Sequence, residues 1–164
     1  MEKSAELILE QFDIHVHQNE WFVSMDVALE GITSAEAAWC LNQSNTIWQI
    51  VNHLLFWNTD VVHRLRGTLN PAQANNNDDT FGEPGNPADE AGWERTLSEL
   101  QGVMQRLRDT IVEMEDGKLD MPYRDEGEPT RRLLSNIMMH DTYHIGQIVL
   151  LRKLQATWNA FNWA

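Results

Sequence analysis

Apolar residues recur along this chain with the spacing of an α-helix, and four long segments carry the pattern. These segments cover about residues 4–17, 47–66, 89–114 and 129–155, and no segment alternates convincingly as a β-strand would. The faces predicted to point inward are Leu7, Ile8, Phe12 and His15; Ile47, Ile50, Val51, Leu54, Trp57 and Val61; Trp93, Leu97, Leu100, Met104, Leu107 and Ile111; and Leu133, Ile137, His140, His144, Ile148 and Leu151. The pattern therefore predicts an all-α protein.

Residues that start and stop helices stand at the expected places. Thr33 and Glu36 have the spacing of a capping box, which predicts one or two helical turns after Thr33. Gly67 is expected to end the second long helix, and Pro129 suits the first turn of the last one. A shorter helical piece is predicted for residues 21–30.

Two long polar connections separate the helices. Residues 68–87 are rich in Asn, Asp, Pro and Gly, and residues 115–128 form a second polar loop. At roughly 20 residues the first exceeds ordinary connections, and loops of that length are often functional or cross from one end of a fold to the other. We therefore expect a single domain over residues 1–164, built as a four-helix bundle with long crossover loops.

The charge balance narrows the range of partners. The chain has 25 acidic and 12 basic residues, a formal net charge of −13, which disfavours binding to nucleic acid. No apolar run reaches the ~20 residues that a membrane span needs, and the charged first 18 residues contain no secretory apolar region. The single cysteine, Cys40, has no internal disulfide partner and is expected to be packed. A cytoplasmic location is the simplest expectation.

Candidate chemistry lies in two histidines four residues apart, His140 and His144, on the apolar stripe of the last helix. Residues at this spacing share one helix face, so two imidazoles can approach one metal ion. The alternative is a pair of core histidines that bond to the backbone or to each other, because a buried imidazole needs hydrogen-bond partners. The spacing alone does not decide between them.

A third ligand would have to come from another helix. His53 lies on the inner face of the second helix, whereas His63 is about 80° away from that face. His15 remains possible although it lies at the end of the first helix, and His17 faces away from Phe12. We choose His53, with an ordinary core histidine as its alternative role.

A zinc-protease motif is a competing interpretation of the segment 140–144. That mechanism needs a glutamate base beside the first histidine and a further ligand, usually downstream. Here Asp141 holds the base position, and no Asp, Glu or His follows His144. The protease interpretation therefore fails on two counts.

Two segments resemble the motifs of the DinB/YfiT-like superfamily. The run from His140 through Gln147 to Arg152 resembles the last-helix motif, and the segment from Asn45 to Leu54 resembles the second-helix motif. Residues 21–31 also fit, so the resemblance covers nearly the whole chain apart from the 70–80 loop and the aromatic tail. It implies a four-helix bundle with a long crossover, often dimeric, that holds a divalent metal on three histidines.

In this chain the implied ligands are His53, His140 and His144. Zinc is the first expectation, with nickel, iron or manganese as alternatives. Because the family includes bacillithiol- and mycothiol-dependent enzymes, we expect a metal-dependent thiol S-transferase, or a hydrolase, acting on a low-molecular-weight thiol and an electrophilic small molecule. Trp57 and Gln147 are expected to contact substrate, and the chain is expected to form a homodimer. The alternative is a non-catalytic metal- or ligand-binding dimer with a degenerate site.

Overall fold

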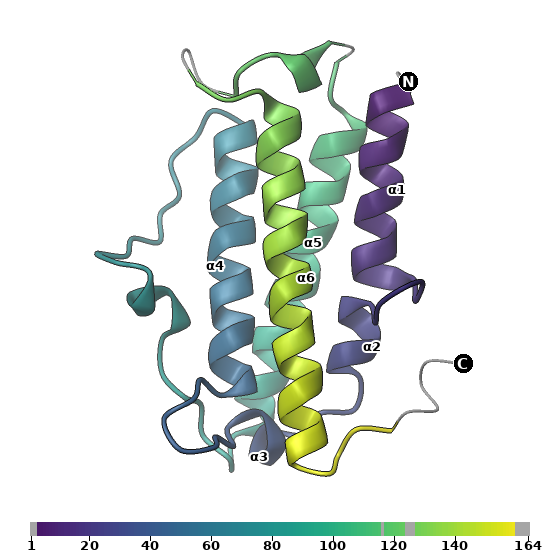
Figure 1. Cartoon of the computed structure of the whole chain (residues 1–164). Coiled ribbons are helices and arrows are strands. Elements are labelled where there is room, and N and C mark those ends of the chain that lie inside the picture. The colour runs from purple at the N-terminus through teal and green to yellow at the C-terminus, as the bar shows by residue number, and fades with distance from the viewer. Residues whose placement is uncertain (1–2, 116, 124–126, 160–164) are drawn as a thin grey trace.

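The computed structural model describes residues 3–115, 117–123 and 127–159, and this part of the chain is all-α (Figure 1). No strand occurs within these residues, where the one extended pairing is an isolated bridge between Pro122 and Pro129. The helices are α1 (Lys3–His17), α2 (Met25–Leu29), α3 (Ser34–Ala37), α4 (Ile47–Leu65), α5 (Glu90–Val112) and α6 (Thr130–Leu154), with short 3-10 helices η1 (Asp78–Phe81) and η2 (Lys118–Asp120). The predicted helical class is confirmed.

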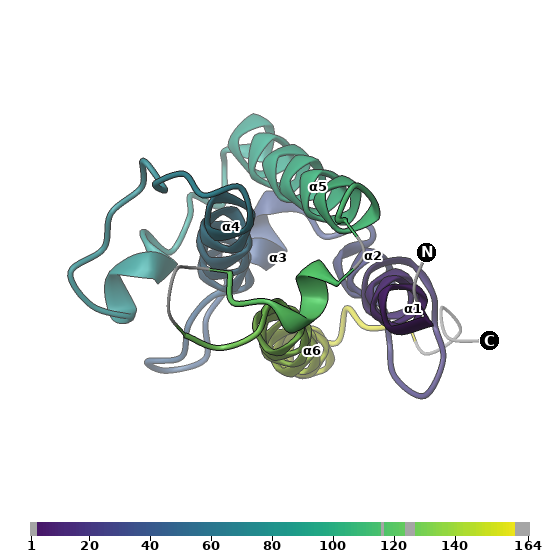
Figure 2. The same ribbon diagram turned by 90° about the horizontal axis from the view of Figure 1, so that it is seen from above.

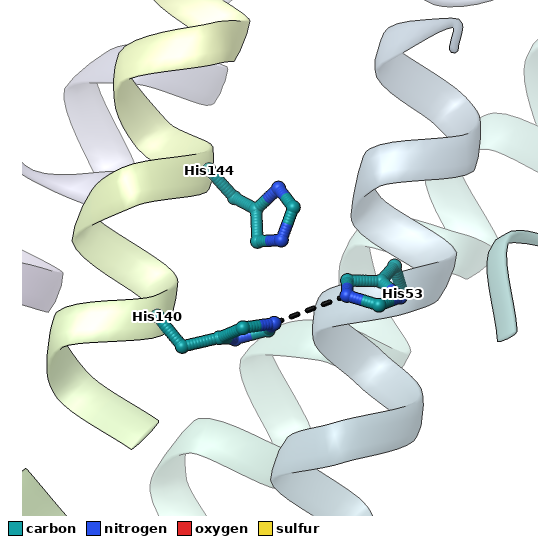
Figure 3. Close-up of side chains that lie close together, drawn as sticks. All are labelled: His53, His140 and His144. Atoms are coloured by element: carbon teal, nitrogen blue, oxygen red, sulfur yellow. Dashed lines mark hydrogen bonds between the residues drawn. The ribbon is translucent and has the colours of Figure 1, made fainter. Parts of the chain in front are cut away.

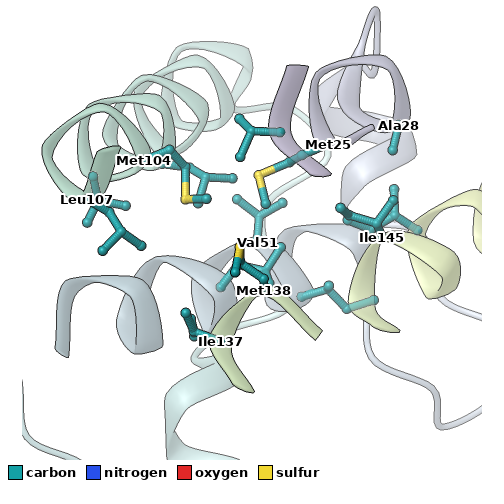
Figure 4. Packing of buried hydrophobic residues seen from close by; sticks show 14 of the residues in the cluster. Met25, Ala28, Val51, Met104, Leu107, Ile137, Met138 and Ile145 are labelled. Carbon is teal, nitrogen blue, oxygen red and sulfur yellow. The ribbon is translucent and has the colours of Figure 1, made fainter. Parts of the chain in front are cut away.

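The long helices α1, α4, α5 and α6 surround a shared apolar core (Figure 2). Helix α4 packs against α5 and α6, while α1 packs against the same two helices and α2 fills the space beside α1 and α6. Figure 4 shows that α2, α4, α5 and α6 all contribute side chains to this core, among them Met25, Val51, Met104, Ile137 and Ile145. Burial of these apolar groups is the main force that holds these helices together.

Capping boxes fix where two of the helices begin. The Thr33 side chain accepts the backbone N–H of Glu36, and the Glu36 carboxylate accepts that of Thr33, which confirms the predicted start of α3. Thr46 and Gln49 form the same arrangement at α4. Because a capping box satisfies backbone donors that the helix leaves free, it sets the register of the α4 side chains.

Three expectations about the first third of the chain are wrong. The helical piece expected at 21–30 is only α2, because Ser24 caps it and Trp21 lies outside it with 94% of its surface exposed. Leu7 is exposed, since it lies five residues before Phe12 and therefore about 140° away around α1. Cys40 is also exposed, because it lies in the turn after α3 rather than in a helix.

The long connection between α4 and α5 lies against α4, and side chains hold it there. Asn52 donates to the carbonyl of Phe81, Gln49 to that of Gly82 and Thr46 to that of Pro84. Since these donors lie three residues apart, from the N-cap of α4 into its second turn, they reach the carbonyls of residues 81, 82 and 84 from one side of the helix. The segment 80–84 is therefore fixed in place beside the inner turns of α4.

No described helix is both long enough and apolar enough to cross a membrane.

Candidate metal centre

Three histidines from two helices converge in the seam between α4 and α6 (Figure 3). His53 comes from α4, and His140 and His144 come from successive turns of α6. One nitrogen from each ring lies within 4.8 Å of the other two, and the Nε2 atoms of His53 and His140 are 3.0 Å apart. The convergence expected from the helical phase of these residues is therefore present.

Burial differs among the three rings. His53 and His144 are buried, whereas 30% of the His140 side chain remains exposed. The group therefore has a closed side within the fold and an open side at His140. Of the three side chains, His140 is therefore the one that solvent contacts most.

The second ring nitrogen of His53 is fixed by Thr80. The Thr80 hydroxyl donates its single proton to the carbonyl of Asn77, at 2.5 Å. The same oxygen lies 2.5 Å from His53 Nδ1, so it must accept the proton that Nδ1 carries. A neutral His53 therefore carries its proton on Nδ1 and an unshared electron pair on Nε2, which faces His140.

The two α6 histidines are oriented in the same way by neighbours on their own helix. His140 Nδ1 donates to the Asp141 carboxylate at 3.2 Å, and His144 Nδ1 donates to Gln147 Oε1 at 2.6 Å. Carboxylates and amide oxygens accept protons here, so each Nδ1 is the protonated nitrogen. The remaining Nε2 of each ring is left with its electron pair.

Three electron pairs thus point toward one small volume. Two unprotonated nitrogens 3.0 Å apart repel each other unless a positive charge lies near both. Three imidazoles whose outer nitrogens are held by hydrogen bonds are a common first shell for divalent ions. His53, His140 and His144 can therefore hold a metal ion, although imidazole ligands alone suit several metals.

Asp141 connects the group to the interior of the protein. It is fully buried, and Asn58 Nδ2 lies 3.1 Å from both carboxylate oxygens, while His15 Nε2 lies 3.5 Å from one of them. Burial alone would raise the pKa of Asp141, but hydrogen bonds and charge from His140 and His15 outweigh it and lower that pKa. Asp141 therefore stays ionised and accepts the proton of His140 Nδ1.

Aromatic rings enclose the histidines. The ring of Phe81 stacks on His53 with centroids 3.9 Å apart and planes 7° apart. Trp57 meets His53 edge-on at 6.3 Å, and Tyr143 meets His144 edge-on at 5.1 Å. These rings limit the directions in which the imidazoles can turn.

The two residues expected to contact substrate have different surroundings. Trp57 lies at the edge of His53, where a substrate contact stays a prediction. Gln147 accepts a hydrogen bond from His144 Nδ1 and thereby orients the His144 ring.

The other histidines are placed elsewhere. His15 is buried behind Asp141, His17 pairs with Asp26, and His63 bonds to Thr68. None of these three belongs to the described group that can hold a metal ion.

Sequence reasoning missed Thr80 and Phe81 and considered Asp141 only as a protease base. For Asp141 a signal was available, since a carboxylate next to a candidate ligand can bind its outer nitrogen. For Thr80 and Phe81 the unusual length of the 68–87 connection indicates a role, but no feature of the sequence singles out these two residues.

The electrostatics of the group oppose its protonation. Burial lowers the pKa of His53 to about 4, and the neighbouring His144 and His140 add to the effect. Burial also lowers the pKa of His144 and outweighs the opposing hydrogen bond to Gln147, while the neighbouring His140 adds a smaller lowering effect. At neutral pH both rings therefore present free electron pairs.

We expect the metal-free protein to lose stability as the pH falls. His53 has a pKa of about 4 in the folded chain against 6.5 in the unfolded one, so the unfolded chain binds more protons between these values. The free energy of unfolding should fall by on the order of 2 kcal/mol between pH 7 and pH 5. Urea unfolding in the presence of a chelator measures this. His53→Gln should reduce the slope of the unfolding free energy against pH; an equal slope in the wild type and in His53→Gln would contradict the assignment.

Comparison with known proteins places the chain in a family. A model of the DinB superfamily matches residues 24–148, a range that includes His53, His140 and His144. A search of curated proteins and a search of solved structures each found no significant match. Since the family model covers well over half of the chain, this protein belongs to the DinB superfamily.

Proposed function

We propose that this chain binds one divalent metal ion on the Nε2 atoms of His53, His140 and His144. The observation that carries the proposal is the 3.0 Å approach of two nitrogens whose protons are held on the opposite sides of their rings. Zinc is the first expectation, and nickel, iron or manganese would also accept three imidazoles.

We also infer that α1, α4, α5 and α6 form the four-helix bundle of the family, with the α4–α5 connection as its crossover.

We propose further that the chain is a metal-dependent enzyme, a thiol S-transferase. With three protein ligands a coordination position stays open, and a bound divalent ion lowers the pKa of a coordinated thiol or water toward neutrality. In the overall reaction the thiol sulfur forms a bond to the electrophilic carbon, while the leaving group departs with the bonding electrons and the thiol proton passes to solvent. The substrates would be a low-molecular-weight thiol and an electrophilic small molecule.

The surroundings of Asp141 favour a thiol as the nucleophile. A water molecule that had to be deprotonated by a side chain would need a free base, and Asp141 is not one. This carboxylate is fully buried and already engaged with His140 and Asn58. It therefore has no free position from which to accept a proton from a substrate. A thiol, which forms its nucleophilic thiolate near neutral pH when its pKa is lowered, needs no such base. Hydrolysis is a variant of the same site.

A non-catalytic metal-binding protein is the second candidate, and the cavities favour it. None of three cavities, of about 630, 750 and 380 Å³, is lined by His53, His140 or His144, and the second reaches the site only at Thr80. Enzyme sites usually lie in a concave pocket. None of these three cavities therefore forms a concave pocket around the exposed side of His140.

Metal analysis tests the proposal that His53, His140 and His144 bind one divalent ion. Untagged protein exchanged against zinc should retain about one ion per chain, since three oriented imidazoles bind such ions tightly. His144→Ala should lower the content to less than about 0.2 per chain because one of the three ligands is lost. His63→Ala, a matched change outside the site, should keep it. Retention by His144→Ala would show that the ligand assignment is wrong.

Thr80 should control metal affinity without touching the ion. Thr80→Val removes the acceptor of His53 Nδ1 and should weaken zinc binding about 10–100-fold, as loss of such outer partners typically does. Thr80→Ser keeps the hydroxyl and should keep the affinity. Competition with a chromophoric chelator measures both variants, and circular dichroism checks their folding. Equal affinity in the wild type and Thr80→Val would remove the role given to this hydroxyl.

Thiol transfer tests the enzymatic proposal. The zinc-loaded protein is mixed with a low-molecular-weight thiol (bacillithiol, mycothiol, cysteine or coenzyme A) and an electrophile such as 1-chloro-2,4-dinitrobenzene or a haloalkane, and the thioether is measured. We expect a rate above the uncatalysed reaction for at least one pair, lost in His140→Ala and kept in His63→Ala. If the wild type and His140→Ala gave equal rates with every pair, the metal-binding protein without catalysis would be the better description.

A further inference from the structure

A cavity of about 750 Å³ lies between α4, α5 and the long connection that joins these two helices. We call it the α4–α5 cavity. Thr80, whose hydroxyl binds His53 Nδ1, belongs to its lining, so the cavity borders the metal centre without including any of the three histidines. The metal centre makes no use of the α5 side of this cavity, which therefore needs an explanation of its own.

The α5 wall of the cavity carries two opposite charges without partners. Glu99 and Arg106 both line the cavity, and neither side chain makes an ion pair or hydrogen bond within the described part of the chain. They lie two helical turns apart on one face, about 10.5 Å along the axis, which is too far for them to pair with each other. Elsewhere in this acidic chain, arginines are paired with carboxylates: Arg64, Arg108, Arg131 and Arg132.

A glycine separates these two charges on the surface of α5. Gly102 lies three residues after Glu99 and four before Arg106, so it occupies the same helix face between them. A Cβ added there would meet only Arg106 Nη1, at 3.3 Å, which is the end of a flexible side chain. Packing therefore does not require a glycine, although glycine inside a helix costs about 1 kcal/mol relative to alanine. What the glycine provides is open space between the two charges.

The other two walls supply apolar surface and a further carboxylate. Leu55 and Phe56 line the cavity from α4, and both are partly buried. Asp79 lines it from the connection, where Asn75 and Asn76 donate hydrogen bonds that hold its carboxylate in place. The described lining therefore combines two carboxylates, one guanidinium and an apolar wall.

This set of charges suits a ligand that carries both signs. A simple anion would be repelled by Glu99, by Asp79 and by the net charge of −13 of the whole chain. A simple cation would leave Arg106 without a partner and would be repelled by it. A ligand with an ammonium and a carboxylate satisfies both signs, and an apolar group on it matches the α4 wall.

We propose that the α4–α5 cavity binds a small zwitterion with an apolar side chain, namely a free α-amino acid such as leucine. Its carboxylate pairs with Arg106, and its ammonium pairs with Glu99 and Asp79 across the gap left by Gly102. Its side chain packs against the apolar α4 wall. The site is independent of the metal proposal, because none of the residues that hold the ligand coordinates the ion.

Calorimetric titration of the metal-free full chain, with a chelator present, tests the binding. Leucine, valine and phenylalanine are the probes, and we expect saturable binding of at least one with a dissociation constant below about 1 mM, a modest affinity for a ligand of this size. Isoamylamine, which is leucine without its carboxylate, and isocaproate, which is leucine without its ammonium, should each bind at least about tenfold more weakly. Failure of all three amino acids to bind, or equal binding of leucine and isocaproate, would overturn the proposal.

Variants on one helix face locate the two charges. Arg106→Gln and Glu99→Gln should each weaken binding about tenfold or more, whereas Arg95→Gln and Glu94→Gln, exposed on α5 outside the three cavities, should leave it unchanged. Gly102→Leu should abolish binding by filling the gap, while circular dichroism shows that α5 is kept, since leucine is a better helix former than glycine. Unchanged affinity in Arg106→Gln or in Gly102→Leu would show that the amino acid binds elsewhere.

Two histidines report which cavity is occupied. In NMR spectra of the metal-free protein, binding should shift the ring signals of His53, because Thr80 contacts both that ring and the cavity. The ring signals of His17, which lines the separate cavity of about 630 Å³ beside α1, α2 and α5, should stay in place. Substitution of each histidine by glutamine assigns the signals. A shift of His17 without a shift of His53 would place the amino acid in the other cavity and overturn the assignment.

Discussion

The hydrogen bond on the outer nitrogen of each histidine is the constraint on which the site depends. An imidazole carries one proton in its neutral form, so fixing that proton on Nδ1 leaves the electron pair on Nε2. Thr80, Asp141 and Gln147 fix the three protons on the sides that face away from the common point. Without these acceptors the rings could share a proton and satisfy each other, as ordinary core histidines do.

Two of the three acceptors follow from helix geometry, and the third does not. Asp141 is adjacent to His140 and Gln147 follows His144 by three residues, so α6 alone brings each pair together. Thr80 lies 27 residues after His53 and reaches it only because the α4–α5 connection is bound along α4. The bonds from Thr46, Gln49 and Asn52 to that connection therefore act on the site through the position of Thr80.

This division explains what the sequence could predict. The inward positions of His53, His140 and His144 follow from the phase of the apolar pattern on α4 and α6, and the fold class follows from the same pattern. The path of the loop depends on side chains that bind individual carbonyls, which no periodicity encodes, so Thr80 and Phe81 could not be predicted. The prediction that Leu7 is buried was wrong because a short apolar stretch near a helix end does not define which face points inward. The prediction that Trp21 is helical was wrong because the Ser24 cap decides where α2 begins.

Helix α6 serves different purposes on different sides. His140 and His144 face α4, and Ile145 and Ile148 face the core. Met139, Tyr143, Leu150 and Leu154 are exposed to solvent. The buried Asp141 anchors the same helix through Asn58 and His15, which holds the direction of both ligand rings.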